Sequence, residues 1–157
     1  MRSVTLRLHA HEVDPLEAYA RVSDFARYPT MAETVRSVVV AEPAADGSVV
    51  SEWTVRFRNG LLRWTERDVL DPAAQTITFT QLTGDFHRFE GTWRVAAAPE
   101  GGTLVTFDAM FDLGMASLEA ILDPIAEGAL RLNITLIVQG LLGAVSELVP
   151  EPALGGA

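Results

Sequence analysis

Closely spaced turn signals divide the middle of this chain into short segments. They are Asp46-Gly47, Asn59-Gly60, Asp71-Pro72, Thr83-Gly84-Asp85 and Gly101-Gly102. Asn-Gly and Asp-Gly dipeptides favour two-residue hairpin turns, and the segments between the signals are rich in β-branched and aromatic residues. Because connections this short join only antiparallel strands, the pattern predicts an antiparallel meander.

A helical pattern precedes the meander. Asp14 as N-cap and Pro15 at the first helical position predict a short helix over 16–25. A further helical turn is expected at 29–33. Before these helices, residues 3–12 alternate between apolar and polar side chains, which predicts a first strand.

A long C-terminal helix is expected over 117–149, capped by Ser117 and kinked at Pro124. Over 132–145 it is almost uniformly apolar, so it must be covered on most sides. The strands expected after the first are 34–41, 49–58, 61–70, 75–82, 86–97 and 103–113. A meander of this length curls through its twist, and the simplest arrangement lays the helix across its concave face.

These elements predict an α+β fold with a curved seven-stranded antiparallel sheet around a long C-terminal helix. No internal repeat or low-complexity linker indicates a second domain. We therefore expect a single domain at 1–149 and a flexible tail at 150–157.

The composition excludes several classes of partner and chemistry. The formal net charge of −9 disfavours nucleic acids and anionic membrane surfaces, because both attract Lys and Arg. All 12 basic residues are Arg, which removes Schiff-base lysine chemistry, and the absence of Cys removes thiol catalysis and Cys-ligated zinc. The apolar run at 132–145 is shorter than the roughly 20 residues of a membrane span, and residues 1–11 alternate rather than forming a signal peptide. We expect a cytoplasmic protein without stable membrane insertion.

Three stretches of sequence carry a family resemblance. They are FARYP at 25–29, RDVLDP at 67–72 and LTGDFHRFEGTWR at 82–94. With the order of elements over almost the whole chain, they resemble the helix-grip fold of the START/SRPBCC superfamily. Two branches are similar: the bacterial aromatic polyketide aromatase/cyclases and the coenzyme Q-binding START-like proteins. FEGTW at 89–93 is closer to the quinone-binding branch.

The resemblance implies a deep apolar cavity between sheet and helix. In the aromatase/cyclases this cavity holds a reactive poly-β-ketone and promotes aldol ring closure and dehydration, with an inward Arg on the strand after the central hairpin. Arg67 is the nearest match here, whereas an alignment on Trp64 puts Asp68 at that place. The Tyr that these enzymes use after the aromatic-Pro motif is missing, since its place falls near Val35. The resemblance also implies polyketide synthase components as partners and a role in antibiotic biosynthesis or other secondary metabolism.

Strand alternation then points to catalytic candidates. His87 shares a face with Phe89 and Trp93, so it is expected to be a titratable group on an apolar inward face, where it could move protons. The alternative is a core or cavity-mouth histidine with a hydrogen-bond partner. Arg67 could hold an enolate oxygen, or it could be a solvated arginine on a strand face. Arg67 and His87 are the predicted catalytic residues.

The predicted substrate contacts are mostly aromatic side chains. They are Tyr28, Trp53, Phe57, Trp64, Phe89, Trp93, Phe107, Phe111 and Asn133. Aromatic stripes also build ordinary cores, and Tyr28 could be a plug before Pro29. Asn133 interrupts an apolar helix, so its amide needs either a substrate carbonyl or a neighbouring strand as partner.

Neither a metal nor a cofactor is expected. His9 and His11 share a strand face beside Glu12, but no third ligand follows at a recognisable spacing. The sequence also lacks a Gly-rich phosphate loop, a serine elbow and a dinucleotide fingerprint.

Two functions remain open at this stage. The first is an aromatase/cyclase-like enzyme that binds a polyketide-type intermediate and promotes aldol cyclisation and dehydration to an aromatic ring. The second is a non-catalytic quinone or lipid carrier. Both take a small hydrophobic or aromatic ligand, and an inward His87 favours the enzyme because a carrier would not need it. Apolar surface on the long helix also leaves room for a homodimer.

Overall fold

The computed structural model describes residues 1–57 and 59–148. Its centre is an eight-stranded antiparallel sheet in the order β2-β3-β4-β5-β6-β7-β1-β8. The strands are β1 (Arg2–Ala10), β2 (Val35–Val40), β3 (Val49–Phe57), β4 (Gly60–Asp71), β5 (Thr76–Gly84), β6 (Arg88–Ala97), β7 (Thr103–Asp112) and β8 (Val145–Glu147). The run from β2 to β7 is the predicted meander, and β1 adds to its far edge beside β7.

The helices lie before and after the meander. Helix α1 (Pro15–Val22) begins as predicted, because Asp14 accepts the N–H of Glu17 on its Oδ1 at 2.9 Å. A 3₁₀ turn at Phe25–Arg27 and the one-turn helix α2 (Tyr28–Met31) follow. After β7, a 3₁₀ turn at Ala116–Leu118 leads into the long helix α3 (Glu119–Leu142).

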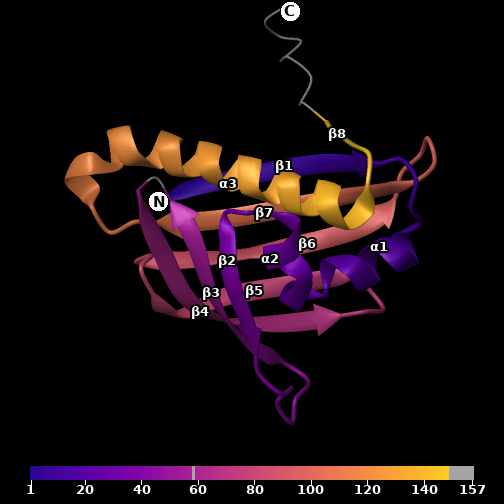
Figure 1. The fold of residues 1–157 in the computed structure, drawn as a ribbon, viewed down its shortest axis with the longest axis horizontal. Helices are drawn as coiled ribbons and strands as arrows, with labels where there is room; N and C mark the ends of the chain where they lie inside the picture. The colour runs from indigo at the N-terminus through magenta and orange to yellow at the C-terminus, as the bar shows by residue number, and fades with distance from the viewer. Residues whose placement is uncertain (58, 149–157) are drawn as a thin grey trace, which may run out of the picture.

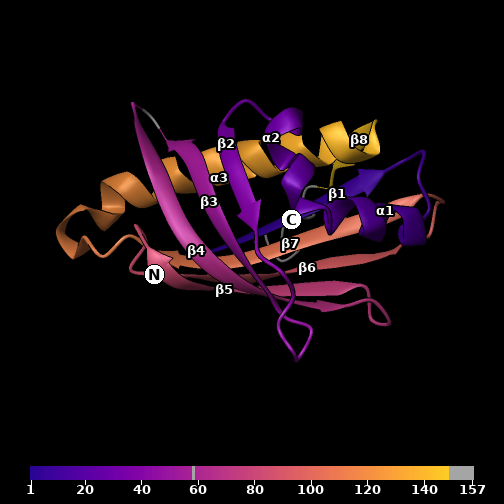
Figure 2. The same cartoon turned by 60° about the horizontal axis from the view of Figure 1, so that its bottom comes forward.

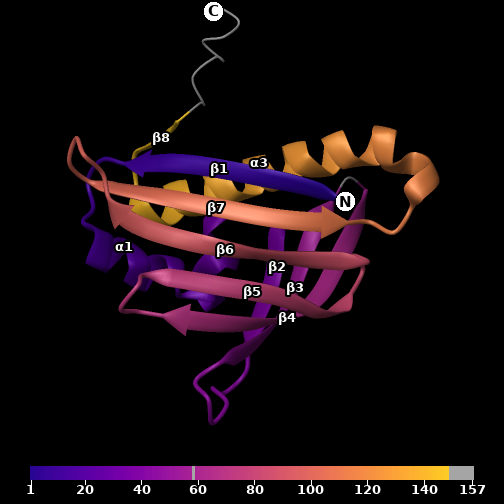
Figure 3. The same cartoon turned by 180° about the vertical axis from the view of Figure 1, so that it is seen from behind.

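Helix α3 lies along the concave face of the curved sheet, which confirms the predicted helix-grip fold (Figures 1 and 2). Helices α1 and α2 sit at one end of the same face (Figure 2). Seen from behind, the strands of the outer face carry no helix within the described part of the chain (Figure 3). The concave side is therefore where a core and a cavity must form.

The core consists of the inward face of each strand and the facing side of α3. On β7, Val105, Phe107, Ala109 and Phe111 are all buried, in the alternation that a half-buried strand requires. Helix α3 adds Ala126, Ile134, Ile137, Val138, Leu141 and Leu142. Each buried Val, Leu, Ile or Phe among them stabilises the fold by roughly 1.5–3 kcal/mol relative to exposure.

The C-terminal end of α3 differs from the sequence-based expectation. The helix ends at Leu142 rather than running to 149, because Gly143 adopts a φ of 83° and turns the chain away. Residues Val145–Glu147 then pair with the end of β1 as an eighth strand, which the sequence analysis missed. Residues 149–157, which include the predicted tail, lie outside the described part of the chain.

The apolar helix bears on the membrane question. The apolar run at 132–145 underestimates the length of the apolar helix, because Ala116–Leu142 as a whole has the length and hydropathy of a membrane span. Core helices meet the same criterion. Here the inward side of α3 is part of the core, which explains the apolar residues on that side, whereas Ile121, Ile125 and Leu132 are exposed.

Two glycines of α3 should respond in opposite ways to substitution by alanine. A Cβ on Gly140 would lie 2.8 Å from Met31 Cβ, so this glycine lets α2 and α3 approach closely, whereas a Cβ on Gly128 would meet nothing within 4 Å. We expect Gly128→Ala to raise the free energy of unfolding by about 0.5–1 kcal/mol, because Ala favours helix more than Gly does. Gly140→Ala should lower it by about 1–3 kcal/mol through overpacking. Urea denaturation of both variants would test this, and equal shifts would contradict the close α2–α3 contact.

Candidate functional site

A small cavity lies between α3 and the concave face of the sheet. It measures about 80 Å³ and adjoins a second hollow of about 50 Å³ that shares Val55, Trp64, Phe89, Leu130 and Asn133 with it. Both volumes lie well below the roughly 300–1,000 Å³ of occupied small-molecule sites. A ring-sized ligand therefore requires lining side chains or α3 to move outward.

The walls are largely aromatic. All the predicted substrate-contact residues line one or both hollows: Tyr28, Trp53, Trp64, Phe89, Trp93, Phe107 and Asn133 the larger one, and Phe57 and Phe111 the smaller one. Trp53 and Trp64 are paired across β3 and β4, and their rings stack with centroids 5.8 Å apart and planes 3° apart. The two indoles therefore pack on each other, and with the neighbouring rings they give the cavity an aromatic lining that suits an aromatic ligand.

Two of these residues already have protein partners. The Tyr28 hydroxyl donates to the Val22 carbonyl oxygen at 2.6 Å, and burial raises the pKa of this phenol well above its usual value. Thr34 Oγ1 donates to Asn133 Oδ1, so this amide bridges α3 to the segment before β2. The first bond joins α2 to α1 and the second joins α3 to the residue before β2, so both side chains have structural partners. Their contact with a substrate stays a prediction.

The expected inward orientation of Arg67 is wrong. Arg67 lies on the outer face of β4, where its Nη2 donates to Asp46 Oδ2 at 2.8 Å, and its side chain is 47% exposed. The cause is strand parity: Trp64 faces the cavity, so Glu66 and Asp68 face inward and the residue between them faces solvent. The alignment on Trp64, which puts Asp68 at the inward place, agrees with the observed register.

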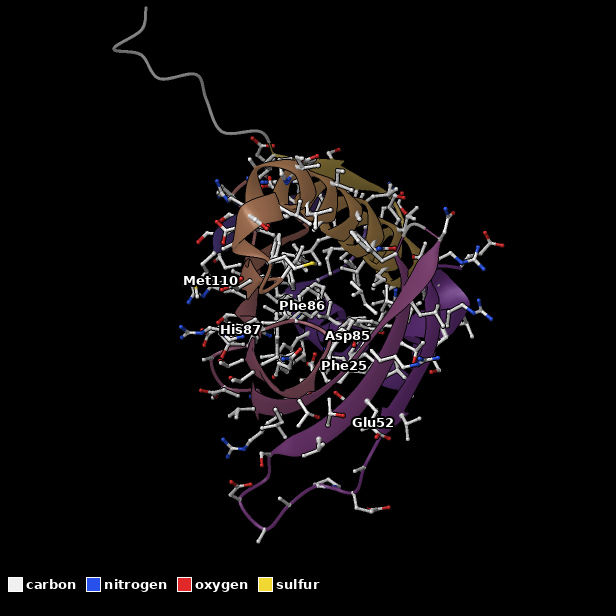
Figure 4. The ribbon with its side chains drawn as sticks, turned by 90° about the vertical axis from the view of Figure 1, so that its left-hand side faces the viewer. Phe25, Glu52, Asp85, Phe86, His87 and Met110 are labelled. Carbon is white, nitrogen blue, oxygen red and sulfur yellow. The ribbon has the colours of Figure 1, made fainter. Side chains whose placement is uncertain are left out.

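The expected inward orientation of His87 is also wrong. Strand β6 begins at Arg88, and His87 is an exposed residue of the preceding bend. Its neighbour Phe86 points toward the interior instead (Figure 4). There its ring stacks on that of Phe89, with the ring centroids 4.6 Å apart. The bend breaks the alternation that was extrapolated back from Phe89, so neither predicted catalytic residue faces the cavity.

The interior of β4 carries two buried acids that the sequence analysis did not single out as a site. Glu66 is 5% exposed and lines the larger cavity, and Asp68 is fully buried behind it. The pattern that could have revealed them is the pairing of two inward tryptophans across the Asn59-Gly60 turn. That pairing assigns the even-numbered residues of β4 to the interior.

Hydrogen bonds tie each acid to the aromatic wall. Trp64 Nε1 donates to Glu66 Oε1 at 2.7 Å. Trp53 Nε1 donates to Ser51 Oγ at 2.8 Å, and Ser51 Oγ in turn donates to Asp68 Oδ2 at 2.6 Å. The two stacked indoles thus also orient the acids, Trp64 directly and Trp53 through Ser51.

The environment of the pair disfavours two negative charges. Burial, reinforced by the neighbouring Asp68, raises the pKa of Glu66 well above its usual value. Burial likewise raises the pKa of Asp68. Among the described residues no arginine or histidine forms an ion pair with either acid. Burial therefore favours the protonated form of Glu66, and this side chain places a carboxyl group in a cavity whose other walls are mostly apolar.

Elsewhere in the described part of the chain, no group of three or more His, Asp or Glu side chains could hold a metal ion. The His9 ring pairs with the Gly101 carbonyl oxygen, and the His11 ring with Ser146 Oγ. These two histidines fasten the β1–β8 edge to its surroundings.

Comparison with known proteins agrees with this fold. Residues 12–136 match the family described as polyketide cyclase/dehydrase and lipid transport, and the chain belongs to this family. No curated protein matches the sequence significantly.

Solved structures show the same architecture. A protein from Thermus thermophilus has a TM-score of 0.78 and 21% identity, over 90% of this chain and 97% of that one. The Zhui aromatase/cyclase from Streptomyces sp. R1128 has a TM-score of 0.74 and 19% identity, over 90% and 92%. A START superfamily protein from Mycobacterium smegmatis has a TM-score of 0.73 and 17% identity, over 90% and 95%. At these identities the likeness establishes the fold alone.

The buried acid predicts a specific pH dependence of stability. A carboxyl group whose pKa is raised in the folded state stabilises the fold while it is protonated, and this contribution is lost as pH rises through the raised pKa. The glutamine of Glu66→Gln cannot ionise, so it does not lose this contribution. The free energy of unfolding of Glu66→Gln minus that of the wild type should therefore rise by roughly 1–3 kcal/mol from acidic pH to pH values above the raised pKa of Glu66. Urea denaturation across this pH range would measure the difference.

Glu52→Gln is the matched control, because Glu52 is exposed on the outer face of the adjacent strand β3 (Figure 4). Its stability should run parallel to that of the wild type at every pH. Parallel curves for Glu66→Gln as well would contradict the raised pKa of Glu66.

Proposed function

We propose that the protein binds a planar, mostly apolar, polyketide-type ketone in this cavity and promotes its aldol cyclisation and dehydration to an aromatic ring without a cofactor. The observation that carries the proposal is the Glu66 carboxyl group on the wall of an aromatic cavity. Enolisation and loss of water both need a group that gives and takes protons, and a carboxyl with a raised pKa is suited to that task at neutral pH. The family, which includes polyketide cyclases and dehydrases, supports the same chemistry.

The cavity itself would contribute to such a reaction. Holding a flexible poly-β-ketone among the aromatic side chains of the cavity would bring the reacting carbons together. Proximity of this kind can lower a barrier by several kcal/mol, and about 7–11 kcal/mol is reached in the best-oriented systems. The apolar walls would also exclude water and so suppress competing ring closures. In this proposal a polyketide synthase supplies the substrate.

A carrier of quinones or lipids is the second candidate. The observation in its favour is that the cavity walls contain few polar groups, chiefly Glu66 and Asn133 among the aromatic and aliphatic side chains. The family description also includes lipid transport. A carrier would bind an apolar ligand without changing it, and Glu66 would then be a hydrogen-bond donor to a quinone oxygen.

A product assay separates the two candidates. A poly-β-ketone made in situ by a minimal polyketide synthase would be analysed by chromatography and mass spectrometry with and without the protein. We expect the wild type and Glu52→Gln to convert a spread of spontaneous products into one cyclised, dehydrated aromatic, and Glu66→Gln to lose at least about 100-fold in rate.

An unchanged product spread with the wild type, together with tight binding of a quinone, would instead establish the carrier. Loss of product in Arg67→Ala or His87→Ala, with Glu66→Gln unaffected, would contradict the role of Glu66. It would indicate that Arg67 or His87 is catalytic, as the family resemblance and the strand pattern suggested.

A further inference from the structure

The starting observation is a buried carboxylate oxygen of Asp68 that has no hydrogen-bond partner. Glu66 and Asp68 are two residues apart on one face of β4, so their Cα atoms are roughly 6.6 Å apart and their side chains leave the strand in the same direction. Each acid has one oxygen fixed, Glu66 Oε1 by Trp64 and Asp68 Oδ2 by Ser51. Asp68 Oδ1 is buried and accepts no hydrogen bond from any donor in the described structure.

A buried carboxylate oxygen without a donor is costly, on the order of 1–3 kcal/mol or more. The group beside it that can supply a donor is Glu66, provided that Glu66 carries a hydrogen. The remaining neighbours are already committed or apolar: Ser51 donates to the other oxygen of Asp68, and across the β4–β5 ladder Asp68 lies opposite Phe79. One proton between the two acids therefore completes the network.

We propose that Glu66 and Asp68 share one proton, that Glu66 is the acid–base residue that touches the substrate, and that the substrate is a cyclic β-hydroxy ketone. This inference rests on the proposed function for its chemical step, whereas the shared proton does not. The roles follow from position: Glu66 lines the cavity and Asp68 does not. Asp68 is thus a positioning residue that holds the pair's own proton while Glu66 reacts.

The charges around the pair keep it singly ionised. From α2, Tyr28 is the titratable group that faces both acids; a phenol is neutral at neutral pH, and burial raises the pKa of Tyr28 further. From β3 the pair meets Ser51 and the Trp53 indole, which are also neutral. With no cation from any of these elements to compensate it, a second negative charge is disfavoured.

The chemical step balances without a co-reactant. The shared proton moves to Asp68, which leaves Glu66 as a carboxylate. Glu66 then removes the proton from the carbon between the ketone and the hydroxyl-bearing carbon. The C–H electron pair forms the new double bond, the C–O bond breaks, and the hydroxyl leaves as water with the proton that Glu66 has just accepted. Glu66 is a carboxylate again at the end. In a six-membered ring that already carries a further carbonyl group or double bond, such as a ring fused to a benzene ring, the product tautomerises to an aromatic phenol.

The shared proton can be tested on the protein alone. Carboxyl carbon NMR with labelled Glu and Asp would follow the titration of Glu66 in the wild type and in Asp68→Asn. We expect Glu66 to titrate far above an ordinary glutamate in the wild type, and at clearly lower pH in Asp68→Asn, because the neighbouring negative charge is gone. Ordinary titration of Glu66 in the wild type, or no change in Asp68→Asn, would overturn the shared proton whatever the activity.

The roles of the two acids are tested with a defined substrate. The probe is the bicyclic β-hydroxy ketone derived from α-tetralone, whose dehydration yields a naphthol with a distinct fluorescence. We expect Glu66→Gln to lose at least about 100-fold in kcat. Asp68→Asn should lose at least about tenfold in kcat with little change in KM, because Asp68 does not touch the substrate.

Binding of unreactive α-tetralone, followed by quenching of the cavity tryptophans, should persist in both variants and shows that they are folded. Glu52→Gln is the control that retains full activity. If Glu66 titrates as expected but the wild type does not dehydrate the probe, the proposed function and the catalytic role of Glu66 are wrong while the shared proton stands. An equal rise of KM in Asp68→Asn and Glu66→Gln would contradict the separate roles of the two acids.

Discussion

The register between β3 and β4 determines what this protein places in its interior. Trp53 pairs with Trp64, and both indoles face α3. Because side chains alternate along a strand, this single pair sends Ser51, Glu66 and Asp68 inward and Glu52 and Arg67 outward. A slip of one residue would reverse every assignment and bury an arginine in place of two hydrogen-bonded acids. The stacked tryptophans and the hydrogen bonds that they donate make the observed register self-consistent.

That register has a cost in stability that an apolar core would avoid. Two carboxyl groups in a low-dielectric interior disfavour ionisation, and no ion pair with a described residue compensates them. Their hydrogen bonds to Trp64 and Ser51 reduce the cost without removing it, as the orphaned Asp68 Oδ1 shows. Local features that lower stability concentrate at functional sites, so the pair is the feature of this cavity that packing alone does not explain.

Much of the architecture could be predicted from the sequence, because turn chemistry and strand alternation are local properties. The meander, the cap at Asp14 and the apolar helix over the sheet were all visible as patterns. The errors arose where a local pattern was extended past a break. His87 was assigned by counting back from Phe89 through a bend, and the C-terminal helix was extended past Gly143, whose positive φ ends it. Arg67 was assigned by a family resemblance on a strand whose own residues do not reveal which face is inward. Only the cross-strand partner of Trp64 decides that, and pairing is a tertiary property.

The choice between carrier and enzyme depends on what Glu66 contributes to the free energy of ligand binding. For a purely apolar ligand, a buried acid is a penalty, because its polar carboxyl group would face hydrocarbon, and an apolar residue of the same size would bind that ligand better. A ligand with a hydroxyl group at that point forms a hydrogen bond with the carboxyl group and reverses the preference. The small volume of the cavity strengthens the argument, since ligand binding must first separate packed aromatic side chains and α3 from the sheet. A planar ligand that carries an oxygen offsets the cost of this separation through both stacking and a hydrogen bond, whereas a simple hydrocarbon offsets it through stacking alone. Selection for oxygenated rings is thus a consequence of where the acid sits, before any chemistry occurs.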